Sequence, residues 1–68
     1  MMLENMSNSE IAAAIDEYVR GEKNRKILKR RLIDLICYEP LAEEFDMSVS
    51  QIKRIIYKAQ EQLFKHIA

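Results

Sequence analysis

The segment from residue 37 to residue 67 constrains the fold most, because its apolar residues follow a helical spacing that stops once and then restarts. The first apolar stripe consists of Leu41, Ala42 and Phe45. The second stripe consists of Ile52, Ile55, Ile56, Ala59, Leu63 and Ile67. Asp46 and Met47 interrupt the pattern only briefly. The segment 37–67 therefore predicts two helices joined by a tight turn, which is a helix-turn-helix pattern.

The start of the second helix carries two sequence signals. Ser48 and Gln51 have the spacing of a capping box, in which each side chain bonds to the other residue's backbone N–H. Met47 and Ile52 have the spacing of the hydrophobic staple that accompanies such a cap. The second helix is therefore predicted over residues 49–66.

The turn and the first helix of this pair are also readable from residue types. Asp46 is one of the few residues other than glycine that tolerate the left-handed conformation a tight turn needs. Cys37 occupies the predicted N-cap, although cysteine is a poor cap. Pro40 falls in the first helical turn, where its missing N–H removes no helical bond.

The N-terminal half predicts two supporting helices within residues 8–36, preceded by a flexible segment over residues 1–7. Ser7 and Glu10 form a second capping box, so the first helix is expected to start near Asn8 and to stop at Gly21. Its apolar face consists of Ile11, Ala14, Ile15, Tyr18 and Val19.

The next helix is expected to be capped by Asn24 and to run to about Ile36. Its apolar stripe consists of Ile27, Leu28, Leu32, Leu35 and Ile36. Its exposed side is basic and consists of Arg25, Lys26, Lys29 and Arg30. Together the four predicted helices give a small all-α fold with a trihelical core and a C-terminal helix-turn-helix, as a single domain over residues 1–68.

Composition agrees with this fold and restricts the compartment. One glycine, one proline and 49% hydrophobic residues favour helices over sheets or disorder. The chain has no apolar run that could span a membrane and no signal-peptide pattern at its start, so no membrane partner is expected. A single cysteine forms no internal disulfide. These features predict a cytoplasmic protein.

Charge is balanced in total but divided into blocks along the chain. Lys and Arg number 11, as do Asp and Glu. Residues 1–19 carry four acids and no base, and residues 20–31 carry seven bases and one acid. Residues 32–47 carry five acids, and residues 48–68 carry four bases and one acid. A neutral chain of this kind has a positive face if the fold brings the two basic blocks together, whereas separated bases would only solvate helix exteriors.

The first half of the predicted second helix carries the residues that a helix-turn-helix presents to the edges of bases in the major groove. The candidate base-reading residues are Val49, Ser50, Lys53 and Arg54. Arginine and lysine can bind guanine, serine can bind several bases, and valine can contact a thymine methyl group. The candidate contacts to the DNA backbone are Gln51, Tyr57, Lys58, Lys29 and Arg30.

The same residues resemble a known family. From Tyr38 to Leu63, the stretch AEEFDMS followed by IKRI and YKA is similar to region 4 of the sigma-70 family, which places bacterial RNA polymerase on the upstream promoter element. The resemblance implies a DNA-binding transcription regulator of bacterial or phage origin. It also implies that base reading falls on residues 49, 50, 53 and 54.

The chain departs from that family in two ways. Family members commonly carry arginine and then glutamate where this chain has Val49 and Ser50, so its preferred DNA sequence is expected to differ. Sixty-eight residues leave no room for the family's other regions, which predicts a freestanding region 4 or half of a split factor. One small module makes few base contacts, so useful affinity requires either a homodimer on paired half-sites or RNA polymerase.

The sequence also bears on two other classes of function. An enzyme is not expected, because Cys37 and His66 are the residues that suggest a nucleophile and a base, and they lie at opposite ends of the motif. A lone cysteine in an apolar stretch is usually a small core residue, and neither a cofactor nor a metal site is indicated. A protein-interaction module that binds polymerase or a sigma factor, without binding DNA itself, would show the same apolar stripes.

Overall fold

The computed structural model describes residues 5–67, and for Ile67 the main chain only. Within this range the chain forms four α-helices and no strand. The helices are α1 (Asn8–Tyr18), α2 (Glu22–Leu32), α3 (Tyr38–Glu44) and α4 (Val49–Ile67). The prediction of a small all-α domain with four helices is therefore confirmed.

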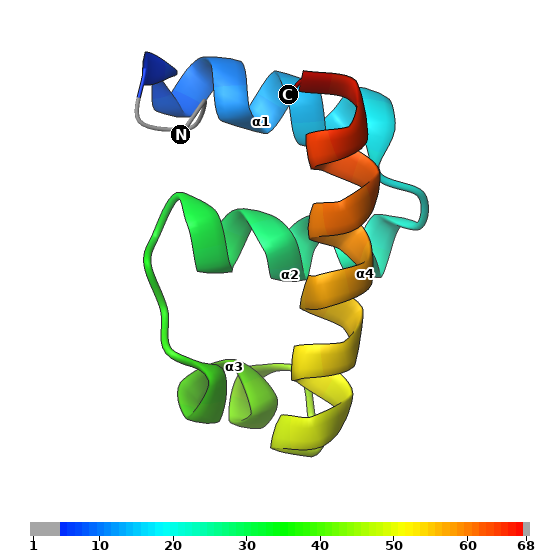
Figure 1. Ribbon diagram of the computed structural model, residues 1–68. Helices are drawn as coiled ribbons and strands as arrows, with labels where there is room; N and C mark the ends of the chain where they lie inside the picture. Colours follow the sequence, from blue (N-terminus) through cyan, green and yellow to red (C-terminus); the bar gives the residue numbers. More distant parts are fainter. Residues whose placement is uncertain (1–4, 68) are drawn as a thin grey trace.

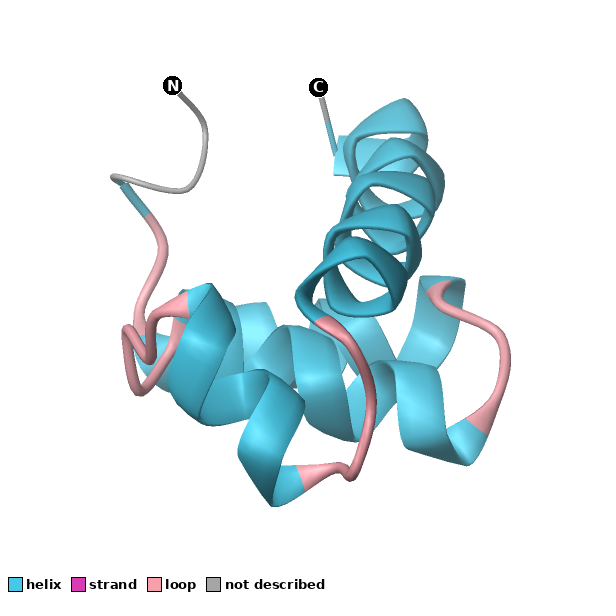
Figure 2. Ribbon diagram, turned by 90° about the horizontal axis from the view of Figure 1, so that it is seen from below, coloured by secondary structure: helices cyan, strands magenta, loops and turns pink. Residues whose placement is uncertain are grey.

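The longest helix, α4, packs against all three others. Its N-terminal end lies beside α3, its middle passes α2, and its C-terminal end reaches α1 (Figure 1). Figure 2, turned to look from below, shows that short loops join the helices and that the α3–α4 loop lies at the N-terminal end of α4. No helix within residues 5–67 has both the length and the apolarity needed to cross a membrane.

One apolar core joins the four helices. Its buried residues are Ile11, Ala14, Ile15, Val19, Ile27, Leu28, Leu41, Ala42, Ile52, Ile56, Ala59 and Leu63. Four of them lie in α4, three in α1 and two each in α2 and α3, and Val19 directly follows α1, so the core is shared by four helices and not by three alone. No polar or charged side chain is buried within the described residues. Packing of apolar stripes therefore fixes the relative positions of the helices.

The start of α1 follows the predicted pattern. Ser7 Oγ accepts from the N–H of Glu10 at 3.2 Å, and Glu10 Oε1 accepts from the N–H of Ser7 at 2.8 Å. Ile11 is buried and Met6 packs against the core. Of the segment expected to be flexible, residues 1–4 lie outside the described residues, whereas residues 6 and 7 have these contacts.

The boundary between α1 and α2 differs from the prediction. Gly21 does not stop α1, which ends at Tyr18, but is the N-cap of α2. Its φ of +88° is a conformation that residues with a Cβ rarely adopt. Because Gly21 makes this turn, α2 begins at Glu22, and the predicted cap Asn24 lies inside the first helical turn. Val19, buried in extended conformation, anchors the end of α1 in the core.

The C-terminal end of α2 also differs from the prediction, since the helix ends at Leu32 rather than near Ile36. The N–H of Ile36 reaches back to the carbonyl of Arg30 at 3.2 Å, which turns the chain away from the helix axis. Leu35, expected in the apolar stripe, has a φ of +58° and is 73% exposed. Cys37 is exposed rather than a core residue.

The left-handed conformation of Leu35 leads to a prediction about stability. A non-glycine residue in this conformation costs about 1–2 kcal/mol, of which glycine recovers a part after its larger loss of backbone entropy. We expect Leu35→Gly to raise the free energy of unfolding by about 0.5–1 kcal/mol, measured by urea unfolding. Leu35→Ala removes the same exposed atoms but keeps a Cβ, so a gain as large in this control would contradict the explanation.

The far end of α4 is held against α1 by an aromatic contact. The rings of Tyr18 and His66 are stacked, with centroids 4.4 Å apart and planes within 7°. The side chain of Ile67, expected in the apolar stripe of α4, lies outside the described side chains. Among the described residues, this stack is the aromatic contact that joins the C-terminal ends of α1 and α4.

Candidate nucleic-acid interface

The connection between α3 and α4 is a tight turn over residues 45–48. Asp46 has a φ of +55°, so the prediction of a left-handed residue at this position is confirmed. The N–H of Met47 donates to the carbonyl of Ala42 at 2.9 Å, which closes the turn on the end of α3. Phe45 and Met47 are half-buried against the core, as expected for residues in the angle between two helices. The turn therefore fixes the direction of α4 relative to α3.

The first turn of α4 is held by the predicted capping box. The N–H of Ser48 donates to Gln51 Oε1 at 2.9 Å, and the N–H of Gln51 donates to Ser48 Oγ at 3.1 Å. Ile52 is fully buried directly after this cap. Since its amide oxygen belongs to the cap, Gln51 has only its amide N–H groups to offer to a ligand.

Removal of this cap has an expected cost. Ser48→Ala leaves a backbone N–H of α4 without its acceptor, so we expect the free energy of unfolding to fall by about 1 kcal/mol. Ser50→Ala, on the exposed side of the same helix and outside the cap, is expected to change it by less than about 0.5 kcal/mol. Urea unfolding of both variants measures the difference, and equal effects would mean that the cap is not responsible.

The predicted reading residues and the predicted backbone contacts of α4 lie mainly on its exposed side. Ser50, Lys53, Arg54 and Lys58 are exposed, and Tyr57 is 57% exposed. The opposite side of the helix is the buried stripe that packs into the core. Val49 is half-buried and packs partly against the core, so less of its side chain faces outward than the sequence pattern predicts. The first half of α4 thus presents a polar and cationic surface.

A cluster at the junction of three helices was not predicted from the sequence. The guanidinium of Arg31 lies 4.7 Å from the ring centroid of Tyr38, and Lys53 Nζ lies 5.4 Å from the same centroid. Arg31 Nη1 also donates to the carbonyl of Ile36 at 3.2 Å. The neighbouring Tyr38 phenol raises the pKa of the Tyr57 phenol above its ordinary value. We call these four residues, Arg31, Tyr38, Lys53 and Tyr57, the tyrosine cluster.

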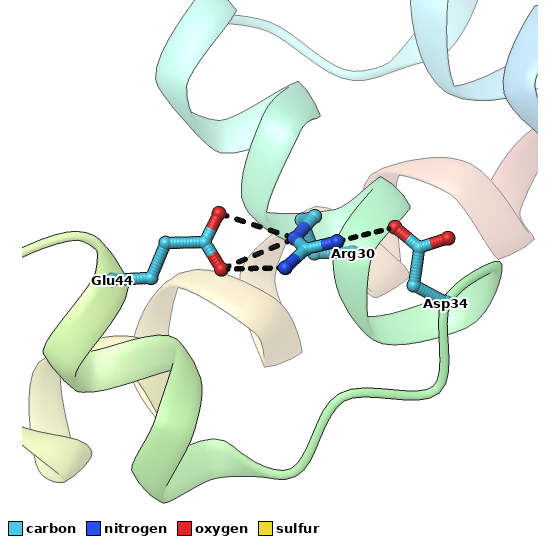
Figure 3. Close-up of polar contacts among 3 residues, drawn as sticks. All are labelled: Arg30, Asp34 and Glu44. Atoms are coloured by element: carbon cyan, nitrogen blue, oxygen red, sulfur yellow. Dashed lines mark hydrogen bonds and ion pairs between the residues drawn. The ribbon is translucent and has the colours of Figure 1, made fainter.

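The two predicted backbone contacts on α2 have partners within the chain. Lys29 Nζ lies 2.7 Å from Asp16 Oδ1 on α1. Arg30 pairs with Glu44 Oε1 and with Asp34 Oδ2, each at 2.9 Å (Figure 3). The hydrogen bond to Glu44, followed by that to Asp34, raises the pKa of Arg30.

Arg30 and Arg31 therefore have different environments although they are neighbours in sequence. The ion pairs of Arg30 fasten α2 to the C-terminal residue of α3, whereas Arg31 lies against the first residue of α3. Within residues 5–67 no carboxylate forms an ion pair with Arg31, Lys53, Arg54 or Lys58. The structure thus brings Lys53 and Tyr57 together with Arg31, and holds Lys29 and Arg30 in ion pairs elsewhere.

A hollow of about 650 Å³ lies beside the α3–α4 turn. Its lining residues are Glu39, Ala42, Glu43, Asp46, Met47, Ser48, Val49 and Gln51. The three carboxylates are exposed and give the hollow a negative charge. Carboxylates repel phosphate, so this acidic hollow marks an edge of any surface that binds nucleic acid.

The metal-ligating residue types, and the two residues that suggest a nucleophile and a base, are dispersed over the described residues. Within the described residues no three His, Cys, Asp or Glu side chains come close enough to hold a metal ion. Cys37 precedes α3, whereas His66 lies near the end of α4 that reaches α1 (Figure 1). These two side chains are therefore not brought together.

No protein-family model, no curated protein and no solved structure matches the chain.

Proposed function

We propose that the chain is a sequence-specific DNA-binding transcription regulator in which α3 and α4 form a helix-turn-helix and the first half of α4 enters the major groove. The observation that carries this proposal is the exposed surface of α4, where Ser50, Lys53, Arg54 and Lys58 stand opposite the buried stripe. A helix-turn-helix reads DNA with residues at these positions of its second helix.

The chemistry of this surface suits base edges and phosphates. Arg54, exposed and without an ion pair among the described residues, can donate two hydrogen bonds to O6 and N7 of guanine. Ser50 can bond to several bases, and the outer part of Val49 can contact a thymine methyl group. Tyr57 and Lys58 lie further along the helix, where contacts go to the DNA backbone.

The other predicted contacts to the DNA backbone, from Lys29, Arg30 and Gln51, have less to offer to phosphate. Lys29 and Arg30 would have to give up their carboxylate partners before binding phosphate. Gln51 can offer an amide N–H without leaving the cap. The sigma-70 region 4 resemblance adds RNA polymerase as a partner, which would supply the affinity that so small an interface lacks.

A second candidate function is favoured by the acidic hollow. Its carboxylates surround the apolar side chains of Ala42, Met47 and Val49, which suits a basic protein segment with an apolar residue. A protein-interaction module that binds polymerase or a sigma factor through this hollow would not need the cations of α4. DNA binding remains the better supported function, because none of those cations forms an ion pair with a carboxylate among the described residues.

Fluorescence anisotropy tests the proposal directly. A labelled duplex carrying an upstream promoter hexamer and a shuffled duplex are titrated with the protein at two salt concentrations. We expect binding that weakens with salt, as phosphate contacts require, and that differs between the duplexes. Absence of binding to both duplexes at low salt would contradict the proposal and favour the interaction module.

A further inference from the structure

Three helices meet at the ring of Tyr38, the first residue of α3. Arg31 comes from the end of α2 and Lys53 from the first half of α4, and both cations lie over this ring. Tyr57 lies one helical turn beyond Lys53 on α4 and is 57% exposed, and the Tyr38 phenol raises the pKa of its phenol. The cluster therefore gathers two cations and two phenols from helices that are separate in sequence.

The two cations of the cluster lack an anion from the chain itself. Ring contacts attract each cation, but Arg31 and Lys53 repel each other, and within residues 5–67 no carboxylate pairs with either. An anion bound at the cluster would relieve this repulsion. The donors suit phosphate, because a guanidinium gives two parallel hydrogen bonds, an ammonium supplies a compact charge, and phenols donate to phosphate oxygens.

We propose that Arg31, Tyr38, Lys53 and Tyr57 bind one phosphodiester of the DNA backbone at the flank of the reading surface. This inference rests on the proposed function and deepens it by bringing α2 into the interface through Arg31. It also divides the predicted reading residues. Lys53, held at the ring of Tyr38, is a backbone contact, whereas Arg54 and Ser50 remain for the base edges.

The salt dependence of binding to a random-sequence duplex counts phosphate contacts. The slope of log affinity against log salt is negative, and each lost contact lowers its magnitude by about 0.9. We expect Arg31→Gln to lower the magnitude by this amount, and Lys23→Gln, an exposed charge near the other end of α2, to leave it unchanged. A slope for Arg31→Gln equal to that of the unmodified protein would overturn the proposal.

Two variants of Tyr38 test whether phosphate binding depends on the aromatic ring or only on the charges of Arg31 and Lys53. Tyr38→Phe keeps the aromatic face and is expected to retain most of the slope, whereas Tyr38→Leu removes the face that holds both cations and is expected to lose about one contact. Circular dichroism checks that each variant is folded. If Arg31→Gln does not fold, Arg31→Lys, which keeps the charge and loses the planar fork, and Tyr38→Leu provide the comparison. Equal slopes for both Tyr38 variants would contradict the proposed role of the ring.

Alanine variants of Lys53 and Arg54 test whether the first contacts phosphate and the second contacts a base. Lys53→Ala is expected to lower the affinity for all duplexes by a similar factor, because a phosphate contact carries no sequence information. Arg54→Ala is expected to reduce the difference between preferred and shuffled duplexes about 5- to 150-fold, the discrimination that a bidentate pair to guanine supplies. A change of sequence preference in Lys53→Ala would place Lys53 at a base instead.

A titration with inorganic phosphate, at constant ionic strength, distinguishes this inference from the proposed function. If no duplex binds, the proposed function fails and the titration tests the cluster alone. Saturating NMR shifts of Arg31 Nε–Hε and of the Tyr38 and Tyr57 rings, with the ring shifts abolished in Arg31→Gln, would support a phosphate site that does not depend on DNA. Shifts no larger at the cluster than at Lys23 would overturn it.

Discussion

Replacement of both Lys53 and Arg54 by alanine is expected to weaken duplex binding by about 100-fold, since it removes one bidentate base contact and one phosphate contact. Both side chains are exposed and neither fills the core, so the helical circular dichroism should not change. Fluorescence anisotropy at fixed salt measures the affinity of the variant and of the unmodified protein.

The control for this variant removes the same number of charges elsewhere. Lys23→Ala with Lys65→Ala deletes two exposed lysines from the first turn of α2 and the last turn of α4. We expect this pair to reduce affinity only a few-fold, through the general field of the protein. Equal losses in the two double variants would mean that binding depends on total charge and not on the surface of α4.

Ile56→Ala is expected to have the largest effect on stability. Ile56 is fully buried in the middle of α4, and truncation of a core isoleucine to alanine typically costs about 2–5 kcal/mol. A single core of this size rarely supplies more than about 3–5 kcal/mol in total. We therefore expect a large unfolded fraction at room temperature, measured by loss of helical circular dichroism and by urea unfolding.

Ile55→Ala provides a matched control, since it deletes the same atoms one residue earlier. Ile55 is only half-buried, so the deletion should cost roughly half as much or less. The two substitutions differ only in the side of α4 that they change. Equal costs would contradict the assignment of the buried stripe.

Local sequence signals predicted the local structure well where side chains act on their own backbone. The serine caps at residues 7 and 48 are formed as their spacing indicates, because a capping box needs no distant residue. Asp46 adopts the left-handed conformation that its residue type tolerates. The start of α4 agrees with the predicted segment for the same reason.

The ends of α2 were predicted wrongly because backbone turns at Gly21 and Leu35, both with positive φ, decide them. Asn24 is a good N-cap by residue type, but the positive φ of Gly21 allowed the helix to begin earlier. Leu35 fits the apolar spacing, but α2 ends at Leu32 and the chain turns toward α3 from there, so Leu35 lies outside the helix and is exposed. Neither the exposure of Leu35 nor that of Cys37 could be read from an apolar stretch alone.

The candidate site could be predicted only in part, because some of its contacts join side chains from different helices. The exposed set on α4 followed from helical spacing within one helix. The tyrosine cluster joins side chains from three helices, so no spacing in the sequence links Arg31 to Tyr38 or Tyr38 to Lys53. Likewise, the basic block of α2 gave no sign that Arg30 pairs with Glu44 while Arg31 does not. One usable signal was the position of Arg31 in that block, close to the start of α3.

The most direct test of the central claim is a map of the DNA-binding surface by NMR. A ¹⁵N-labelled sample is titrated with a duplex at moderate salt, and the backbone amide shifts are followed residue by residue. We expect the largest changes over residues 49–58 and at the tyrosine cluster, with small changes at the carboxylate residues of the acidic hollow, Glu39, Glu43 and Asp46, and along α1. Shifts concentrated at Glu39, Glu43 and Asp46, or no shifts at all, would contradict the assignment of this surface to DNA.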